Sequence, residues 1–430
     1  MESSMARSVI KGGTVIDATG ARGADVAVEG GVITEVSPNI DTTTAQVIDA
    51  TGCVVGPGLV DLHTHLREPG REEAETFESG ARAAALGGFT CVMAMPNTRP
   101  DIDNESVVRH IQSISKGVMC DVSIAAAISI GREGRQLVNM SELAKLGVRM
   151  FTDDGSCVQS NRLMRRALEY SLPLDVTIGS HCEDYSLSAG GHMHEGAVSS
   201  RLGIDGIPLE AEELMVMREI ALTKRTGARM HLMHLSTAGS VAMVRAAKEQ
   251  GLAITAEAAP HHFTLTDDEI ASFDPVFKVY PPLRPAVHRD AVREGLSDGT
   301  IDAIATDHAP HAPNLKERPF DEAPCGMLGL ETALSLALTE LGLPIDRVLA
   351  LMSWQPARIA RVEASHGGPV AAGRDANLVV IDPEATWVVD RLALASKAHN
   401  TPYQGRQLKG KVRHTFLHGE PVVQDGIAQR

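Results

Sequence analysis

The chain has 430 residues, enough for a barrel of about 250–300 residues together with an accessory domain. Hydrophobic residues make up 43% of it and aromatic residues only 3%, so a large core must consist mainly of aliphatic side chains. The net charge of -15 excludes the basic surface that is typical of nucleic-acid-binding proteins.

Both ends of the chain predict short β-strands separated by turns. Glycine pairs such as Gly30-Gly31 are typical of tight hairpin turns. The β-rich pieces cover residues 8–10, 25–28 and 32–36 at the amino end and 376–381, 385–389 and 411–417 at the carboxyl end. We expect the two ends to pair into one small β-sandwich.

Between these ends, apolar runs alternate with segments of helical periodicity. The runs are typical of strands buried on both faces of a parallel sheet. They cover residues 59–63, 90–95, 121–128, 148–152, 174–182, 229–236, 253–261 and 302–309. The helical segments cover residues 77–86, 105–113, 162–170, 210–226, 240–250, 289–296 and 329–341. Eight β/α units predict an α/β fold, a (β/α)8 TIM barrel at residues 56–368, with residues 1–55 and 369–430 forming the sandwich domain.

Polar residues stand at the carboxyl ends of these runs, where parallel barrels carry their functional groups. Successive side chains of a strand alternate between its faces, so His63 and His65 point the same way. Imidazole and carboxylate groups together suit zinc or a similar divalent ion. The predicted metal ligands are His63, His65, His181, His234, Asp307 and one member of the pair Asp153 and Asp154. Parity alone does not choose between the two members of that pair.

Four residues are assigned roles in the reaction or in substrate binding. Asp307 is the predicted catalytic acid/base, because a carboxylate beside a metal can accept the proton of an attacking water and pass it to a leaving nitrogen. The guanidinium group of Arg67 can form two parallel hydrogen bonds to a carboxylate, which predicts an anionic substrate. Asn97 follows the second run, and His311 lies in a loop that could fold over a ligand.

The remaining features favour an ordinary intracellular enzyme. The six cysteines have no C-x-x-C spacing and are interpreted as free thiols in a reducing compartment. We expect no signal peptide at residues 1–7 and no membrane span, because no apolar run reaches about 18 residues; a cytoplasmic location follows. The pair His261-His262 is expected to support the site rather than to form it.

These motifs resemble those of the amidohydrolase superfamily, and within it the dihydroorotases of the bacterial type I class. The resemblance covers essentially the whole chain. The specific motifs are GPGLVDLHTHLREPG at 56–70 and ATDHAPH at 305–311; the shorter ones are MPNT at 95–98, FTDDG at 151–155, HCED at 181–184 and HLST at 234–237.

The resemblance implies the reversible cyclisation of N-carbamoyl-L-aspartate to L-dihydroorotate with loss of water, in de novo pyrimidine (UMP) biosynthesis. It also implies one to two Zn²⁺ per chain. His63, His65 and Asp307 would hold one zinc, His181 and His234 the second, and Asp154 would bridge them. The substrate's α-carboxylate would be bound by Arg67, Asn97 and His311.

Two departures from related sequences affect the choice of substrate. Many relatives bridge their metals with a carboxylated lysine, but residues 147–155 contain no lysine, which favours dihydroorotase over hydantoinase. The family usually has Asn-Pro-Pro-Leu-Arg where this chain has Tyr280-Pro281-Pro282-Leu283-Arg284. Since that asparagine touches the pyrimidine ring, Tyr280 is the fourth predicted substrate contact, and we expect weaker ring binding.

Two other functions are compatible with the residues. One is another cyclic amidohydrolase, such as a hydantoinase or allantoinase. The other is a weakly active homologue that serves as a structural partner of aspartate transcarbamoylase. The expected ligand is a small-molecule substrate with a carboxylate. The candidate protein partners are a second copy of the chain, in a homodimer, and aspartate transcarbamoylase; neither a nucleic acid nor a membrane is expected.

Overall fold

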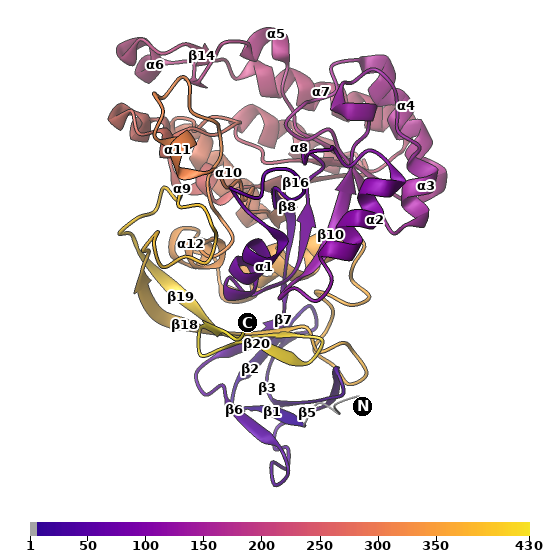
Figure 1. Ribbon diagram of the computed structural model, residues 1–430, viewed down its shortest axis with the longest axis vertical. Coiled ribbons are helices and arrows are strands. Elements are labelled where there is room, and N and C mark those ends of the chain that lie inside the picture. The colour runs from indigo at the N-terminus through magenta and orange to yellow at the C-terminus, as the bar shows by residue number, and fades with distance from the viewer. Residues whose placement is uncertain (1–6) are drawn as a thin grey trace.

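The computed structural model describes residues 7–430 and consists of a barrel with a smaller layered β-domain beneath it (Figure 1). The expected absence of a signal peptide concerns residues 1–7, which lie almost entirely outside the described residues. Within residues 7–430, no helix is both long and apolar enough to cross a membrane.

The centre of the molecule is an eight-stranded parallel sheet that curves into a barrel. Its strands, in spatial and chain order, are β8 (Leu59–Thr64), β9 (Phe89–Ala94), β10 (Asp121–Ala126), β11 (Met150–Phe151), β12 (Thr177–Ser180), β15 (Met230–Leu232), β16 (Ile254–Ala258) and β17 (Ala303–Ile304). A bridge between Thr64 and His308 brings the first strand beside the chain that follows the last one. The predicted (β/α)8 fold is confirmed.

Helices cover the outside of this sheet, and most coincide with the predicted segments (Figure 1). The longer ones are α1 (Phe77–Leu86), α2 (Glu105–Ile114), α4 (Asn161–Ser171), α7 (Glu210–Thr226), α8 (Ala238–Glu249), α10 (Ala286–Asp298) and α12 (Ala333–Glu340). Local signals fix their ends. The Thr76 side chain caps α1 by accepting from the Ser79 amide, and Gly227 ends α7 in the left-handed conformation.

Several further elements lie in the connections between the predicted segments. They are α3 (Met140–Lys145), α5 (Tyr185–Ser188), β13 (Met193–His194), α6 (Ala197–Leu202), β14 (Gly206–Ile207), α9 (Pro260–Thr264), α11 (Pro313–Lys316), α13 (Ile345–Leu349) and α14 (Gln355–Ala360). Most of these elements have only two to six residues and are too short to show a helix or strand period. The exceptions are α13 and α14, which a π-helical segment, Ala350–Trp354, joins into one continuous helical stretch that the prediction missed.

The barrel interior carries the site at one end. Met150 and Ala303 belong to a buried cluster that includes Ala360 of α14. Asp154 and Asp307 follow the ends of β11 and β17, at Phe151 and Ile304. Both carboxylates therefore lie just beyond the carboxyl ends of the barrel strands, where parallel barrels carry their functional groups.

Both chain ends contribute to the β-domain. Its four-stranded sheet has the order β5 (Val32–Ser37), β4 (Asp25–Glu29), β1 (Ser8–Lys11) and β6 (Gln46–Asp49). Its seven-stranded sheet has the order β21 (Ile427–Ala428), β20 (Glu420–Gln424), β19 (Gln407–Leu417), β18 (Leu378–Val388), β7 (Val54–Pro57), β2 (Thr14–Asp17) and β3 (Gly20–Gly23). Ile10 and Val26 of the first sheet pack with Val380 and Phe416 of the second.

Two predicted details of this domain differ from the structure. The predicted strands at 376–381 and 385–389 form one strand, β18, whose pairing with β19 is interrupted by a register shift between Asp382 and Thr386. A β-bulge of this kind interrupts the alternating pattern without ending the strand. The division of the chain at residues 55 and 368 stays a prediction; β7 crosses the first of these positions.

Candidate metal centre and active site

Asp154 lies at the centre of four histidines. Its Oδ1 is 3.4 Å from His63 Nε2, 3.6 Å from His181 Nδ1 and 3.7 Å from His234 Nε2. Its Oδ2 is 3.6 Å from His65 Nε2. Three imidazoles thus surround Oδ1 and the fourth faces Oδ2, so this one carboxylate is within reach of cations held by either histidine pair.

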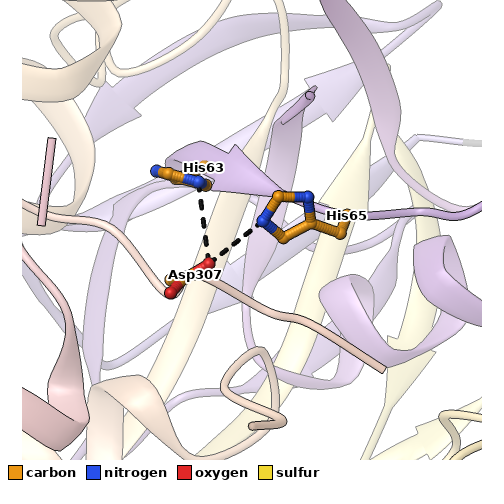
Figure 2. Close-up of side chains that lie close together, drawn as sticks. All are labelled: His63, His65 and Asp307. Carbon is orange, nitrogen blue, oxygen red and sulfur yellow. Dashed lines mark hydrogen bonds and ion pairs between the residues drawn. The ribbon is translucent and has the colours of Figure 1, made fainter. Parts of the chain in front are cut away.

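Asp307 joins the His63–His65 side of this cluster, as Figure 2 shows. Its Oδ1 is 3.1 Å from His65 Nε2 and 3.6 Å from His63 Nε2. All three side chains are buried and point toward a common centre. Two sets of three side chains have ligand atoms close enough to share one ion: His63, His65 and Asp307, and His63, Asp154 and His234.

Three of the histidines are held through the ring nitrogen that points away from the cluster. Nδ1 of His63 is 2.8 Å from Glu257 Oε1, and Nδ1 of His65 is 2.9 Å from Asn97 Oδ1. Nε2 of His181 is 2.9 Å from Glu183 Oε2. Each of these oxygens accepts a hydrogen bond from the ring N–H, which leaves the other ring nitrogen free to bind a metal.

The electrostatics of the cluster fit a divalent cation. Burial disfavours the charged form of His63, but Asp154, Glu257 and Asp307 outweigh burial and raise its pKa well above 6.5. Burial likewise opposes ionisation of Asp154, yet the neighbouring histidines hold its pKa well below 3.8. A cation in this place would satisfy the same negative charge and displace the proton of His63.

Buried polar atoms that have no hydrogen-bond partner also indicate that the cluster suits a cation. Among residues 7–430, the buried polar atoms without a hydrogen-bond partner include His63 Nε2, Asp154 Oδ1 and His261 Nε2. Such atoms are rare in folded proteins because each one costs desolvation free energy. His261 lies on the other side of Asp307, with Nε2 3.9 Å from Asp307 Oδ2, and so borders the cluster.

Asp153 does not take part in the cluster. Its Oδ1 accepts hydrogen bonds from the backbone amides of Ile128 and Ser129, at 2.8 and 3.0 Å, and its Oδ2 accepts from the Ser129 hydroxyl. The neighbouring residue Asp154 therefore faces the barrel interior while Asp153 anchors a loop. This placement favours Asp154 as the bridging acid.

Three residues of the site adopt a left-handed backbone conformation. Arg67, His234 and Asp307 have φ of 64°, 33° and 47°. This conformation is unfavourable for residues with a Cβ, and such strain clusters at functional positions. All three residues lie beyond the ends of their strands, which stop at Thr64, Leu232 and Ile304. Strand alternation therefore does not set the directions of their side chains.

A cavity of about 220 Å³ opens beside the cluster. The predicted substrate residues Arg67, Asn97, Tyr280 and His311 all line it. The sequence did not single out Arg71, Glu183 and Cys325, which also line it. Arg71 adds a second guanidinium on the same side as Arg67, which fits an anionic ligand.

Arg67 is held with its guanidinium in the wall of the cavity. It is 5% exposed, and its Nε donates to the Pro310 carbonyl at 3.0 Å. Burial, and then the charge of Arg71, lower the pKa of Arg67 to about 10, so the group remains charged at neutral pH. The bond at Nε leaves the two terminal nitrogens to meet a ligand.

Tyr280 and His311 already have partners on the protein. The Tyr280 hydroxyl donates to the Gly191 carbonyl. Nε2 of His311 is 2.7 Å from the Cys325 carbonyl oxygen and donates to it. Burial and the nearby Arg67 lower the pKa of His311 to about 2, so the ring is neutral and this N–H is its donor.

Sequence reasoning missed the groups that orient the ligands. The Glu257 carboxylate, on β16, forms two hydrogen bonds: Oε1 lies 2.8 Å from His63 Nδ1, and Oε2 lies 2.9 Å from His231 Nε2. Arg132 donates to the Asp154 carbonyl at 2.7 Å and pairs with Asp101. A glutamate inside the apolar run 253–261 was the available signal, because a buried acid requires a partner.

Known proteins resemble this chain in sequence and in fold. A family model described as Dihydro-orotase-like matches residues 52–240. A dihydroorotase from Pelotomaculum thermopropionicum is 47% identical over 426 residues, which are 97% of this chain and 99% of the relative. One from Streptomyces coelicolor is 44% identical over 430 residues, 98% and 99% of the two chains.

Among solved structures, an L-hydantoinase (dihydropyrimidinase) from Arthrobacter aurescens superimposes with a TM-score of 0.89 and 24% identity, over 99% of this chain and 98% of that chain. This likeness establishes the fold. The sequence identity to dihydroorotases extends over nearly the full length of both chains, and it is this identity that places the chain in the dihydroorotase family of metal-dependent amidohydrolases.

Proposed function

We propose that the protein is a zinc-dependent dihydroorotase that interconverts N-carbamoyl-L-aspartate and L-dihydroorotate in pyrimidine biosynthesis. The observation that supports it most is Asp154 between two histidine pairs, with Asp307 beside one pair and Arg67 in the wall of the adjoining cavity. Relatives that are 44–47% identical over nearly the whole chain carry the name dihydroorotase. Hydrolysis of dihydroorotate by the purified protein, followed with its metal content, tests the proposal.

Six side chains would hold two cations. His63, His65 and Asp307 would bind one, His181 and His234 the other, and Asp154 would bridge them. Nitrogen and carboxylate ligands of this kind suit zinc. When bound, the cations supply Lewis-acid polarisation of the amide carbonyl and a lower pKa for water.

Asp307 would move the proton. In the hydrolytic direction, water adds to the ring carbonyl, the C–N bond breaks, and the ring nitrogen gains a proton. The neighbouring histidines lower the pKa of Asp307 despite its burial, so it is ionised and can accept the proton from water before passing it to nitrogen. Cyclisation follows the same path in reverse.

The cavity wall would orient the substrate. Arg67 would grip the α-carboxylate with its terminal nitrogens. The Nδ2 group of Asn97 can donate to the same carboxylate, because Asn97 Oδ1 is bound to His65. His311 would bind it by transferring its Nε2 donor from the Cys325 carbonyl to the ligand. These contacts select a substrate that carries a carboxylate.

A hydantoinase activity has weaker support. The solved hydantoinases share the fold at 22–25% identity, about half the identity of the dihydroorotases. No lysine occurs at residues 147–155 to bridge the metals in the manner of hydantoinases. A purely structural role beside aspartate transcarbamoylase has less support still, because every ligand position is filled. Assembly as a homodimer or with aspartate transcarbamoylase stays a prediction.

Arg67→Lys is expected to lower kcat/KM for dihydroorotate by about tenfold or more, while dihydrouracil, which lacks the carboxylate, is affected by less than about threefold. A lysine keeps the charge but cannot form two parallel hydrogen bonds, and one such bond to a charged group is worth about 1.5–3 kcal/mol. Steady-state kinetics on both substrates measures the difference. Equal losses on the two would assign Arg67 a structural role.

Tyr280→Asn is expected to raise kcat/KM for dihydroorotate, by up to about tenfold if it restores one ring contact worth about 1.4 kcal/mol. The Tyr280 hydroxyl is engaged by Gly191 and offers the ring little, whereas an amide offers a donor and an acceptor. Tyr280→Phe removes only the bond to Gly191 and serves as the control, with kcat/KM unchanged. A fall for Tyr280→Asn at unchanged metal content would mean that the tyrosine is an adapted part of the pocket.

A further inference from the structure

A long loop of the β-domain reaches the edge of the active site. Residues 389–406 connect β18 to β19, and Figure 1 shows this loop in yellow, rising from the two strands toward the barrel. It is attached to the barrel at several points. Glu331 Oε1 accepts from the Ala395 amide at 2.8 Å, and the hydroxyls of Tyr403 and Thr264 are 2.9 Å apart.

Asn400, in the middle of this loop, joins two separate pieces of the cavity wall. Its Oδ1 accepts from the His311 backbone amide at 3.2 Å. Its Nδ2 donates to the carbonyls of Ala309 and Gly326, both at 3.0 Å. Amides can only donate and carbonyls can only accept, so these three partners fix the orientation of the side chain. Asn400 is 4% exposed.

The two joined pieces carry His311 and the carbonyl that holds it. Ala309 precedes His311 by two residues, and Gly326 follows Cys325, whose carbonyl accepts from His311 Nε2. The two segments also touch directly, since the Ala309 amide donates to the Met327 carbonyl at 2.8 Å. Asn400 adds a second connection beyond that bond, at the level of His311 and Gly326, and so helps to fix the position of the imidazole. There is little space for a different arrangement, because a Cβ at Gly326 would lie 2.9 Å from His311 Nε2.

The same loop also reaches His308 through Glu75. Glu75 accepts from the Ser396 hydroxyl and, at 3.2 Å, from the Lys397 amide. Glu75 also binds the Ser79 hydroxyl and His308, whose Nε2 is 3.3 Å from Glu75 Oε2. The segment 307–311 is thus fixed by the loop at His308 and again at Ala309 and His311.

We propose that Asn400 is a positioning residue of the active site: it holds the His311 imidazole where it can bind the substrate's carboxylate. This proposal rests on the proposed function, in which His311 contacts that carboxylate. Asn400 itself touches no reacting atom. Its effect passes through His311, so the two residues must be energetically coupled.

A double-mutant cycle with Asn400→Ser and His311→Ala tests this coupling through kcat/KM for dihydroorotate. We expect Asn400→Ser alone to lower kcat/KM by about tenfold to 10²-fold, the scale of a misplaced binding group. In the His311→Ala background, the same change should cost less than about twofold. Losses that multiply in the double variant, or an Asn400→Ser enzyme within about threefold of wild type, would overturn the proposal.

The chain offers a matched control in Asn377. This asparagine is also buried, donates to the Ser365 carbonyl at 3.0 Å and accepts from the His418 amide at 2.7 Å, but it lies in the β-domain away from the cavity. Asn377→Ser should lower the melting temperature and leave kcat/KM unchanged. Asn400→Asp, which keeps the side-chain shape and the acceptor for His311, repeats the cycle with a smaller steric change. Loss of metal or of cooperative unfolding in both Asn400 variants would assign Asn400 to the fold and refute the proposal.

Failure of the proposed function has a different signature. A wild-type protein without dihydroorotate turnover, or a His311→Ala enzyme with full activity, would remove the carboxylate contact itself. A strong His311→Ala defect beside an unaffected Asn400→Ser enzyme would leave the proposed function in place and reject only the role of Asn400.

Discussion

Removal of the metal by a chelator is expected to reduce dihydroorotate turnover by about 10³-fold or more, and readdition of zinc is expected to restore it. Lewis-acid stabilisation of the developing charge is worth several kcal/mol, and each 1.36 kcal/mol is a factor of ten in rate. The purified protein should carry one to two zinc ions per chain by elemental analysis. A metal-free protein with full activity would contradict the predicted site.

Adjacent acids provide the matched comparison for this prediction. Asp154→Asn should lose metal together with turnover, because Asp154 lies within 3.4–3.7 Å of the ligand nitrogens of four histidines. Asp153→Asn should retain metal, because Asp153 binds Ile128 and Ser129 instead. His63→Ala should resemble Asp154→Asn. Retention of both ions in Asp154→Asn would assign the bridge to another group.

Asp307→Asn is expected to lower kcat by about 10²–10⁴-fold through loss of the proton acceptor, and by more if one metal is disturbed. An amide has nearly the same shape and still offers one oxygen toward His65, so the fold and at least one metal should remain. The measurement combines kcat with metal content and the melting temperature. Activity within about threefold of wild type would show that another group carries the proton.

Asp302→Asn is the control for the Asp307 variant. Asp302 lies just before β17, at the opposite end of the strand from Asp307, where it accepts from Lys248 Nζ at 2.6 Å and from the Ala256 amide at 2.8 Å. Groups at that end of a barrel contribute to stability rather than to chemistry. The variant should therefore unfold at a lower temperature and keep its kcat.

Local sequence patterns determined the fold and the inward direction of several site residues. Apolar runs alternating with helical segments predicted the barrel because a strand buried on both faces needs a continuous apolar run. The two-residue spacing of His63 and His65 predicted that both rings face one way, and both lie within 3.6 Å of Asp154. These properties depend only on the backbone period and are readable from a few adjacent residues.

Tertiary structure alone decided which groups complete the site. Residue spacing could not choose between Asp153 and Asp154. In the structure, the backbone amides of Ile128 and Ser129 donate to Asp153, whereas Asp154 faces the histidines. Glu257 orients His63 across 194 residues of chain. Such partners are selected by the segments that barrel closure brings together, and no local period records that choice.

The loop that carries Asn400 is the clearest example of a contact that local sequence patterns do not predict. Residues 389–406 have no periodic pattern, and Asn400 stands 89 residues from His311 in sequence. A polar side chain in such a loop is usually solvated. Its burial against three backbone groups of the cavity wall exists only because β18 and β19 place the loop against the barrel. The sequence by itself thus determined the barrel and the residues predicted to bind metal, whereas the folded chain decided how the surrounding groups hold those residues in place.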